Sequence, residues 1–188
     1  MQPKTNFDIS LPLGLIVLLG GARSGKSSLA VELATQSNKS VIFIATAQAH
    51  DEDMKNRIAR HRSERPNWQT IEEPINLNAA LNNCATNALV IIDCLTLWIS
   101  NLMLGGYSET EIRTANTLVL SAIDRRVGTT IAISNEVGLG IVPETPIGRD
   151  YRDGLGRINQ QWVRASSKSL FLVAGRALEL QKPERLLR

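Results

Sequence analysis

This sequence has few aromatic residues and only a small net charge. Phe, Trp and Tyr make up 4% of its 188 residues, which argues against the stacked aromatic platforms that bind single-stranded nucleic acid. The 21 basic and 18 acidic residues leave a formal charge of +3, too little to indicate DNA binding, so we expect no nucleic-acid partner. The small positive excess is compatible with an ordinary basic surface or with a protein that handles polyanionic nucleotides.

Cysteines are few, and no apolar run is long enough to span a membrane. Cys84 and Cys94 lie beside apolar residues without metal-ligand spacing, so we expect buried, reduced thiols in a reducing compartment. The apolar run 11–19, LPLGLIVLL, resembles a signal-peptide core but is too short to cross a bilayer. Because it leads directly into a glycine-rich loop, we interpret it as a buried strand and expect a cytoplasmic protein.

Apolar segments alternate with helical patterns along the rest of the chain. This alternation predicts an α/β fold with a mostly parallel central sheet and helices on both faces. No repeat or linker divides the chain, so we expect a disordered N-terminal tail at 1–12 and a single domain at 13–188. The patterns predict strands at 13–19, 40–45, 88–93, 129–134 and 169–174, helices at 26–36, 51–65, 95–103, 108–126 and 151–166, a loop at 142–148 and a polar tail at 176–188.

The glycine-rich segment GGARSGKS matches the phosphate-loop pattern G-x-x-x-x-G-K-[ST] between a predicted strand and a predicted helix. Its glycines let the backbone turn tightly and direct N–H groups inward, beside the positive end of the following helix. Lys26 is placed to reach the outer phosphates as a catalytic residue, and Ser27 to ligate Mg²⁺. A chance glycine turn, or a loop that binds nucleotide without catalysis, is the alternative. The predicted nucleotide-binding residues of this loop are Gly20, Gly21, Ala22, Arg23, Ser24, Gly25, Lys26 and Ser27.

Asp93 ends the apolar segment ALVIID. The carboxyl ends of parallel strands meet where a phosphate loop lies, so this carboxylate can hold Mg²⁺ together with Ser27. The alternative role is an N-cap for the helix that follows. Asn135 and Glu136 also follow a predicted strand and point toward the same end of the sheet. Their glycine-containing loop either contacts a substrate or is purely structural.

The chain has two histidines, and one of them lies in a cluster of arginines. His50 is expected to be exposed and without a role. His61 belongs to the segment RIARHRSERP, and on a helix it shares a face with Arg57 and Arg65. A triphosphate between these cations would relieve their repulsion, and neighbouring cations favour the neutral imidazole that could attack an α-phosphate. A solvated basic surface is the commoner explanation for such a pattern, and the residues alone leave both open.

Several segments occur together in a characteristic order. They are GGARSGKS, IATAQ at 44–48, RIARHRSERP followed by Trp68, IIDCLT at 91–96 and SNEVGLGIVPETPIGRDYRDGLGRINQ at 134–160. Over about residues 15–174 the chain resembles the bifunctional adenosylcobinamide kinase/adenosylcobinamide-phosphate guanylyltransferase family. The resemblance implies a RecA-like P-loop fold, a homotrimer and a place in cobalamin biosynthesis. It implies that ATP or GTP phosphorylates adenosylcobinamide, and that GMP then passes from GTP through a histidine intermediate to give adenosylcobinamide-GDP.

The resemblance also assigns roles to particular residues. His61 is the histidine of the matching motif, so the resemblance implies that it becomes guanylylated. It implies GTP, ATP and Mg²⁺ as cofactors, and a contact of Asp93 with either Mg²⁺ or the guanine edge. The further nucleotide-binding residues that it implies are Thr46, Ala47, Gln48, Arg62, Arg65 and Glu72.

Two other functions compete with this one. The first is a small-molecule kinase with the same P-loop and no covalent intermediate. The second is a RecA-like ATPase that binds nucleic acid, which the weak net charge and the few aromatic residues disfavour.

Overall fold

The computed structural model describes residues 11–49 and 51–187. The tail expected at 1–12 therefore lies outside the described residues, apart from Leu11 and Pro12. Leu11 packs against the core, and the carbonyl of Pro12 accepts a hydrogen bond from Thr129 Oγ1 at 3.0 Å.

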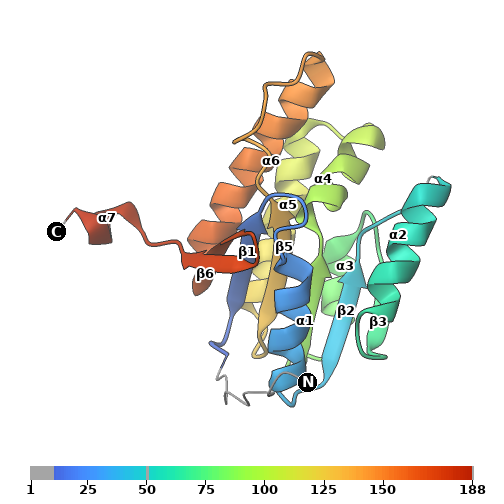
Figure 1. Cartoon of the computed structure of the whole chain (residues 1–188), viewed down its shortest axis with the longest axis vertical. Coiled ribbons are helices and arrows are strands. Elements are labelled where there is room, and N and C mark those ends of the chain that lie inside the picture. Colours follow the sequence, from blue (N-terminus) through green and yellow to red (C-terminus); the bar gives the residue numbers. More distant parts are fainter. Residues whose placement is uncertain (1–10, 50, 188) are drawn as a thin grey trace.

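A seven-stranded sheet forms the centre of the molecule (Figure 1), with strand order β3-β2-β4-β5-β1-β6-β7. The first six strands of the chain run parallel to one another, and only β7 runs antiparallel, beside β6. The mostly parallel sheet predicted from the sequence is thus confirmed. The strands are β1 (Leu15–Gly20), β2 (Val41–Ala45), β3 (Gln69–Glu72), β4 (Leu89–Asp93), β5 (Thr130–Asn135), β6 (Lys168–Val173) and β7 (Arg176–Glu179).

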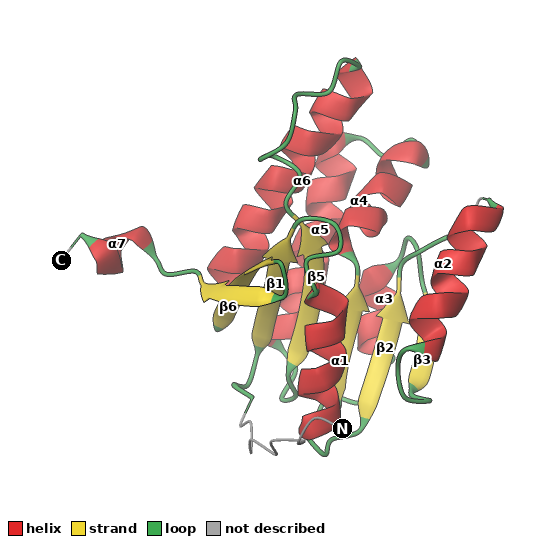
Figure 2. Cartoon of the chain, viewed as in Figure 1, coloured by secondary structure: helices red, strands yellow, loops and turns green. Residues whose placement is uncertain are grey.

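Helices cover both faces of this sheet, as Figure 2 shows. Side chains alternate between the two faces of the sheet along a strand. In β1, Ile16 and Leu18 therefore lie on one face of the sheet and Val17 on the other. The first face packs against α1, and the second packs against the helices that carry Trp98 and Trp162. The helices are α1 (Lys26–Gln36), α2 (Glu52–Ser63), α3 (Leu77–Asn82), α4 (Leu95–Leu104), α5 (Glu109–Asp124), α6 (Pro146–Ala165) and α7 (Pro183–Leu186). None of those in the described ranges is apolar and long enough to cross a membrane.

Several helix boundaries differ from the prediction, most of them by one or two residues. The helix expected at 51–65 is α2, and it ends at Ser63 because the residue before Pro66 is disfavoured in helical conformation. The helix expected from residue 151 is α6, and it begins at Pro146 within the loop predicted at 142–148. Thr145 Oγ1 accepts the Gly148 N–H at 3.3 Å, and a proline fits the first helical turn, so this helix start is well capped.

The sequence patterns missed elements at both edges of the sheet. β3 and α3 lie between 66 and 88, where no element was predicted. The polar tail expected at 176–188 contains β7 and α7 instead. All four residues of β7 are exposed, so the strand lacks the apolar alternation by which strands are recognised.

Candidate nucleotide-binding site

The predicted phosphate loop joins β1 to α1. Gly25, with φ of 100°, precedes the first helical residue, Lys26, and takes a left-handed conformation that favours glycine. Lys26 Nζ is buried and donates hydrogen bonds to the carbonyls of Gly20 at 3.0 Å and Gly21 at 2.6 Å. Burial lowers the pKa of Lys26, while Cys94 and Asp93 oppose that shift. The ammonium group therefore lies inside the loop, where a phosphate would meet it.

The turn between β6 and β7 supports the same loop from the side. The N–H of Gly175 donates to the carbonyl of Ser24 at 3.0 Å. A Cβ atom at Gly20 would overlap the carbonyl oxygen of Leu172, on β6. Gly20 is thus required by a contact with a distant part of the chain as well as by the phosphate pattern.

Asp93 lies at the end of β4, beside the phosphate loop. Ser27 Oγ donates a hydrogen bond to Asp93 Oδ2 at 3.3 Å. Burial raises the pKa of the Asp93 carboxyl, and His61, the Ser27 hydrogen bond, Arg65 and Lys26 oppose the shift. The alternative role of Asp93 as a helix N-cap is wrong, because Cys94 occupies that position and no side chain caps α4.

The two oxygens of Ser27 and Asp93 fit a Mg²⁺ site. Magnesium is commonly held by one or two protein oxygens and completes its octahedral shell with phosphates and water. Within residues 11–49 and 51–187, no group of three or more His, Cys, Asp or Glu side chains could hold a metal by itself. A cation at Ser27 and Asp93 would therefore complete its coordination with phosphate oxygens and water.

The basic segment of α2 approaches Asp93 from the α1 face of the sheet. His61 is half-buried. Its charge lowers the pKa of Asp93 more than the charges of Arg65 and Lys26 do. Arg65 lies past the end of the helix, where its guanidinium stacks 3.7 Å from the centre of the Phe43 ring and donates to Thr70 Oγ1 at 3.1 Å. Burial lowers the pKa of Arg65, and Asp93 opposes that shift. His61, Arg65 and Asp93 therefore converge.

Other residues predicted around this site lie at its margin. Arg62 is exposed on α2, and Glu72 is exposed at the end of β3, where its charge raises the pKa of Arg65. The side chain of Arg57, predicted to share the face of His61, lies outside the described residues. Ala47 and Gln48 follow β2 and are half-buried, so both are accessible in part to a ligand.

Thr46 has a clear structural role. It is fully buried, and its Oγ1 accepts the N–H of Cys94 at 2.8 Å and donates to the carbonyl of Cys94 at 2.7 Å. Asn101 Nδ2 donates to the carbonyl of Thr46 at 2.8 Å. These bonds tie the end of β2 to the residue that follows Asp93, so the Thr46 side chain fixes the backbone at the end of β4. A contact of Thr46 with the nucleotide stays a prediction.

Thr46→Val should therefore destabilise the fold without changing its shape. The substitution leaves the N–H of Cys94 without its buried partner, whereas the Cys94 carbonyl keeps its bond from the Trp98 N–H. An unsatisfied buried N–H costs roughly 1–3 kcal/mol of unfolding free energy. Urea denaturation followed by circular dichroism measures this loss. Thr35→Val is the matched control, because Thr35 is exposed on α1 and bonds only to the carbonyl of Val31. Equal stability of both variants would contradict the structural role of Thr46.

The loop after β5 reaches the phosphate loop, as the position of Asn135 and Glu136 predicted. The N–H of Glu136 donates to the carbonyl of Gly20 at 3.1 Å. Asn159 and Thr96, which sequence reasoning missed, hold Asn135 from α6 and α4. Both residues lie in helices whose buried faces are mainly apolar, so the sequence pattern gives no sign of their polar contacts. The signal that could have identified Asn159 is an amide on an otherwise apolar helix face.

Comparison with known proteins supports the family resemblance that the sequence motifs indicate. The family described as cobinamide kinase / cobinamide phosphate guanyltransferase matches residues 16–180. The chain belongs to this family. The bifunctional adenosylcobalamin biosynthesis protein CobP of Pseudomonas aeruginosa is 41% identical over 167 residues, covering 88% of this chain and 96% of that protein. The protein CobU of Escherichia coli, with the same description, is 33% identical over 181 residues, covering 89% and 99%.

Members of the cobinamide kinase family are thus similar to this chain over nearly their whole length. Among solved structures, an ATPase of the type III secretion system superposes with a TM-score of 0.50 at 12% identity, covering 93% of this chain and 60% of that one. At that identity the likeness shows the fold alone. The RecA-like P-loop fold predicted for the chain is confirmed.

Proposed function

We propose that this chain phosphorylates adenosylcobinamide with ATP or GTP and then transfers GMP from GTP to the product, through a covalent intermediate on His61. The relatives are described as bifunctional proteins of adenosylcobalamin biosynthesis, and the matching family as kinase and guanyltransferase. The observation that carries the proposal is the convergence of Lys26, Ser27, Asp93 and His61 at one end of the sheet. A site with a phosphate cradle alone would need no histidine there.

Each residue has a distinct part in the proposed reactions. Lys26 and the N–H groups of the phosphate loop bind the phosphates and stabilise the charge that develops during transfer. Ser27 and Asp93 would hold Mg²⁺, which neutralises phosphate charge. The side chains of Arg62 and Arg65 would bind phosphate oxygens, while Gln48 and Glu72 would contact the nucleoside.

His61 carries the covalent step. A neutral ring nitrogen attacks the α-phosphorus of GTP, and the bond from that phosphorus to the α–β bridging oxygen breaks, so pyrophosphate leaves. A phosphate oxygen of the phosphorylated acceptor then attacks the same phosphorus. The phosphorus–nitrogen bond breaks, and the histidine is restored. The half-buried position of His61, facing Asp93, supports this assignment.

The direct test is product identification. Adenosylcobinamide incubated with the protein and ATP should gain one phosphate, and addition of GTP should then give adenosylcobinamide-GDP, both identified by mass spectrometry. Absence of the first product would refute the kinase assignment. Appearance of the first product without the second would favour a single-step kinase.

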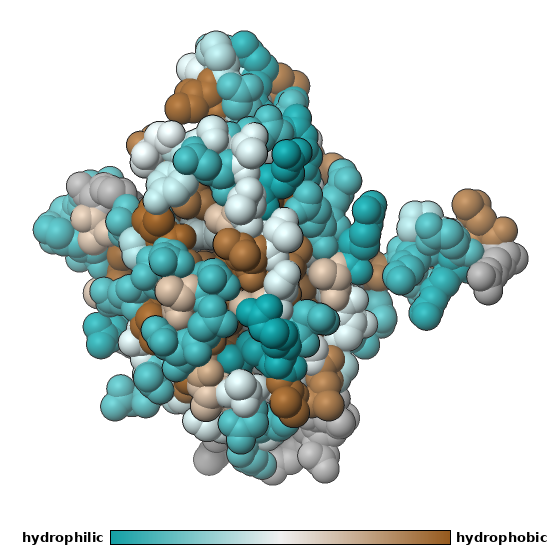
Figure 3. All heavy atoms as spheres, turned by 180° about the vertical axis from the view of Figure 1, so that it is seen from behind, coloured by the Kyte–Doolittle hydropathy of each residue, from teal (hydrophilic) through white to brown (hydrophobic). Residues whose placement is uncertain are grey.

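We further propose that the protein is a cytoplasmic homotrimer. Apolar side chains gather on the loop between β5 and α6, where Leu139 is 78% and Ile141 is 97% exposed. Figure 3 shows apolar residues at this end of the molecule, along with others on the same face. Such a patch favours a partner subunit. Light scattering on the sample used for product identification should give three times the mass of the chain, and a monomer mass would contradict the proposal.

A further inference from the structure

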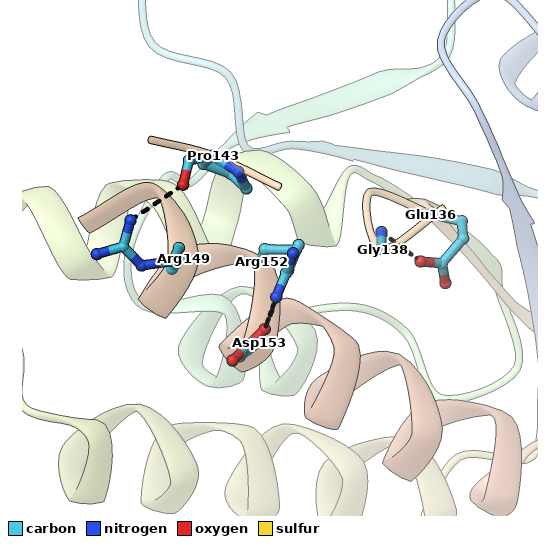
Figure 4. Close-up of polar contacts among 6 residues, drawn as sticks. All are labelled: Glu136, Gly138, Pro143, Arg149, Arg152 and Asp153. Atoms are coloured by element: carbon cyan, nitrogen blue, oxygen red, sulfur yellow. Dashed lines mark hydrogen bonds and ion pairs between the residues drawn. The ribbon is translucent and has the colours of Figure 1, made fainter. Parts of the chain in front are cut away.

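A shallow polar cavity, widely open to solvent, lies on the opposite side of the sheet from His61. Its volume is about 500 Å³, and it opens between the loop after β5 and α6. Figure 4 shows Gly138 on the loop and the ion-paired Arg152 and Asp153 on α6. The lining offers guanidinium, carboxylate and amide groups, which both donate and accept hydrogen bonds. The lining residues are Gly138, Arg152, Asp153, Gly156, Arg157 and Gln160.

Glu136 connects this cavity to the phosphate loop. β5 lies directly beside β1, with Asn135 opposite Gly20. The carbonyl of Gly20 accepts both the N–H of Glu136 at 3.1 Å and the ammonium of Lys26 at 3.0 Å. Two residues later, the N–H of Gly138 donates to Glu136 Oε1 at 2.7 Å (Figure 4), and Gly138 lines the cavity. Glu136 is therefore bonded to the phosphate loop through its backbone and to a cavity-lining residue through its carboxylate.

Buried hydrogen bonds fix the backbone from which Glu136 extends. The N–H of Asn135 donates to Thr96 Oγ1 at 2.8 Å, and its carbonyl accepts Asn159 Nδ2 at 3.0 Å. Asn159 is 4% exposed and also accepts a hydrogen bond from Ser134 Oγ at 2.7 Å. Within the described part of the chain, no residue donates a hydrogen bond to the second oxygen, Glu136 Oε2. One oxygen of a positioned carboxylate is thus free to bind a ligand.

The cavity and His61 approach the phosphate loop from different faces of the sheet. Arg65 stacks on Phe43, which belongs to the α1 face, while α6 packs on the other face through Leu155 and Trp162. In phosphoryl transfer the attacking and leaving oxygens lie roughly in line, on opposite sides of the phosphorus. An acceptor in the cavity would therefore approach the γ-phosphate from a side that the histidine does not occupy.

We propose that this cavity binds the acceptor of the kinase reaction and that Glu136 takes the proton of its hydroxyl group. The inference rests on the proposed function, because adenosylcobinamide carries peripheral primary amides that match the hydrogen-bonding groups of the lining. As the hydroxyl O–H bond breaks, the proton passes to the free oxygen of Glu136. The hydroxyl oxygen bonds to the γ-phosphorus, the bond from that phosphorus to the β–γ bridging oxygen breaks, and a nucleoside diphosphate leaves.

Glu136→Gln separates the kinase step from the guanylylation step. The amide cannot accept the proton, so kcat for phosphorylation of adenosylcobinamide by ATP should fall by about a hundredfold. Labelling of the protein by [α-³²P]GTP should stay within about threefold of wild type, because it needs no acceptor. Glu144→Gln is the control, since Glu144 is exposed on the same loop and only its backbone carbonyl bonds to Arg149. Unchanged phosphorylation in Glu136→Gln, or an equal loss of both activities, would overturn the role of Glu136.

Two glycines of α6 test the cavity itself. A Cβ at Gly154 or Gly156 would meet no atom within 4 Å, so a side chain can leave the helix into open space at either position. Gly156 lines the proposed acceptor cavity, whereas Gly154 lines a neighbouring one of about 320 Å³. Gly156→Leu should raise KM for adenosylcobinamide at least about tenfold and leave KM for ATP unchanged, while Gly154→Leu changes neither. No effect of Gly156→Leu, or the same effect of both, would overturn the inference. A wild-type protein without kinase activity would refute the proposed function instead.

Discussion

Replacing His61 with alanine should abolish covalent labelling of the protein by [α-³²P]GTP. Wild-type protein should carry a label that is stable to alkali and labile to acid, as expected of a phosphoramidate. The Cys94 thiol beside Asp93 is a poor substitute for the imidazole, because burial raises its pKa to about 12. Labelling and adenosylcobinamide-GDP formation should therefore fall by at least about a hundredfold. Phosphorylation of adenosylcobinamide by ATP should persist, because that step transfers the γ-phosphate directly.

The other histidine provides the matched control. His50→Ala should retain the label, since His50 is assigned no role. Label that persists in His61→Ala would remove His61 from the mechanism and favour another nucleophile. Absence of label in wild-type protein that still phosphorylates adenosylcobinamide would instead favour the single-step kinase. These outcomes separate the role of the residue from the existence of the intermediate.

Lys26→Met should remove both activities while leaving the fold intact. The ammonium of Lys26 lies inside the phosphate loop, so its loss should lower kcat for phosphorylation and the rate of labelling each by about 100- to 1000-fold. Stability should change little, because burial already disfavours the charged amine, and the Gly20 carbonyl keeps its bond to the Glu136 N–H. Steady-state kinetics and thermal unfolding measure the two effects.

Lys39→Met is the control for the loss of a positive charge. Lys39 is exposed in the turn after α1, so its replacement should change neither activity. If Lys26→Met kept one activity at the wild-type rate, the two reactions would use different phosphate sites. If it unfolded the protein, the buried amine would be needed for the structure of the loop.

The phosphate loop and the central strands could be predicted because their causes are local. Glycines at fixed spacing set the loop, and runs of β-branched residues buried on both faces set β2, β4 and β5. The edge strands β3 and β7 escaped prediction because β3 is short and exposed at both ends and β7 is exposed throughout, so neither has a clear apolar pattern. Their pairing depends on neighbours that are distant in the sequence.

The candidate site shows the same division between local and distant causes. The positions of Lys26, Ser27 and Asp93 follow from the ends of predicted strands. The approach of His61 to Asp93 depends on how α2 packs, and the Arg65 side chain is directed by Phe43 and Thr70 after the helix has ended. Neither contact has a sequence signal, and the function of the arginine cluster stays a prediction.

The turn between β6 and β7 completes the phosphate loop, and this has a consequence for protein synthesis. β1 leaves the ribosome first, but both of its neighbours, β5 and β6, are made much later. Gly175, whose N–H binds Ser24, follows only after β6. For most of its translation, a growing chain therefore has a phosphate loop that lacks the neighbouring strands and the Gly175 hydrogen bond. Nucleotide in the cell can stabilise the protein by binding only once nearly all of the chain has emerged.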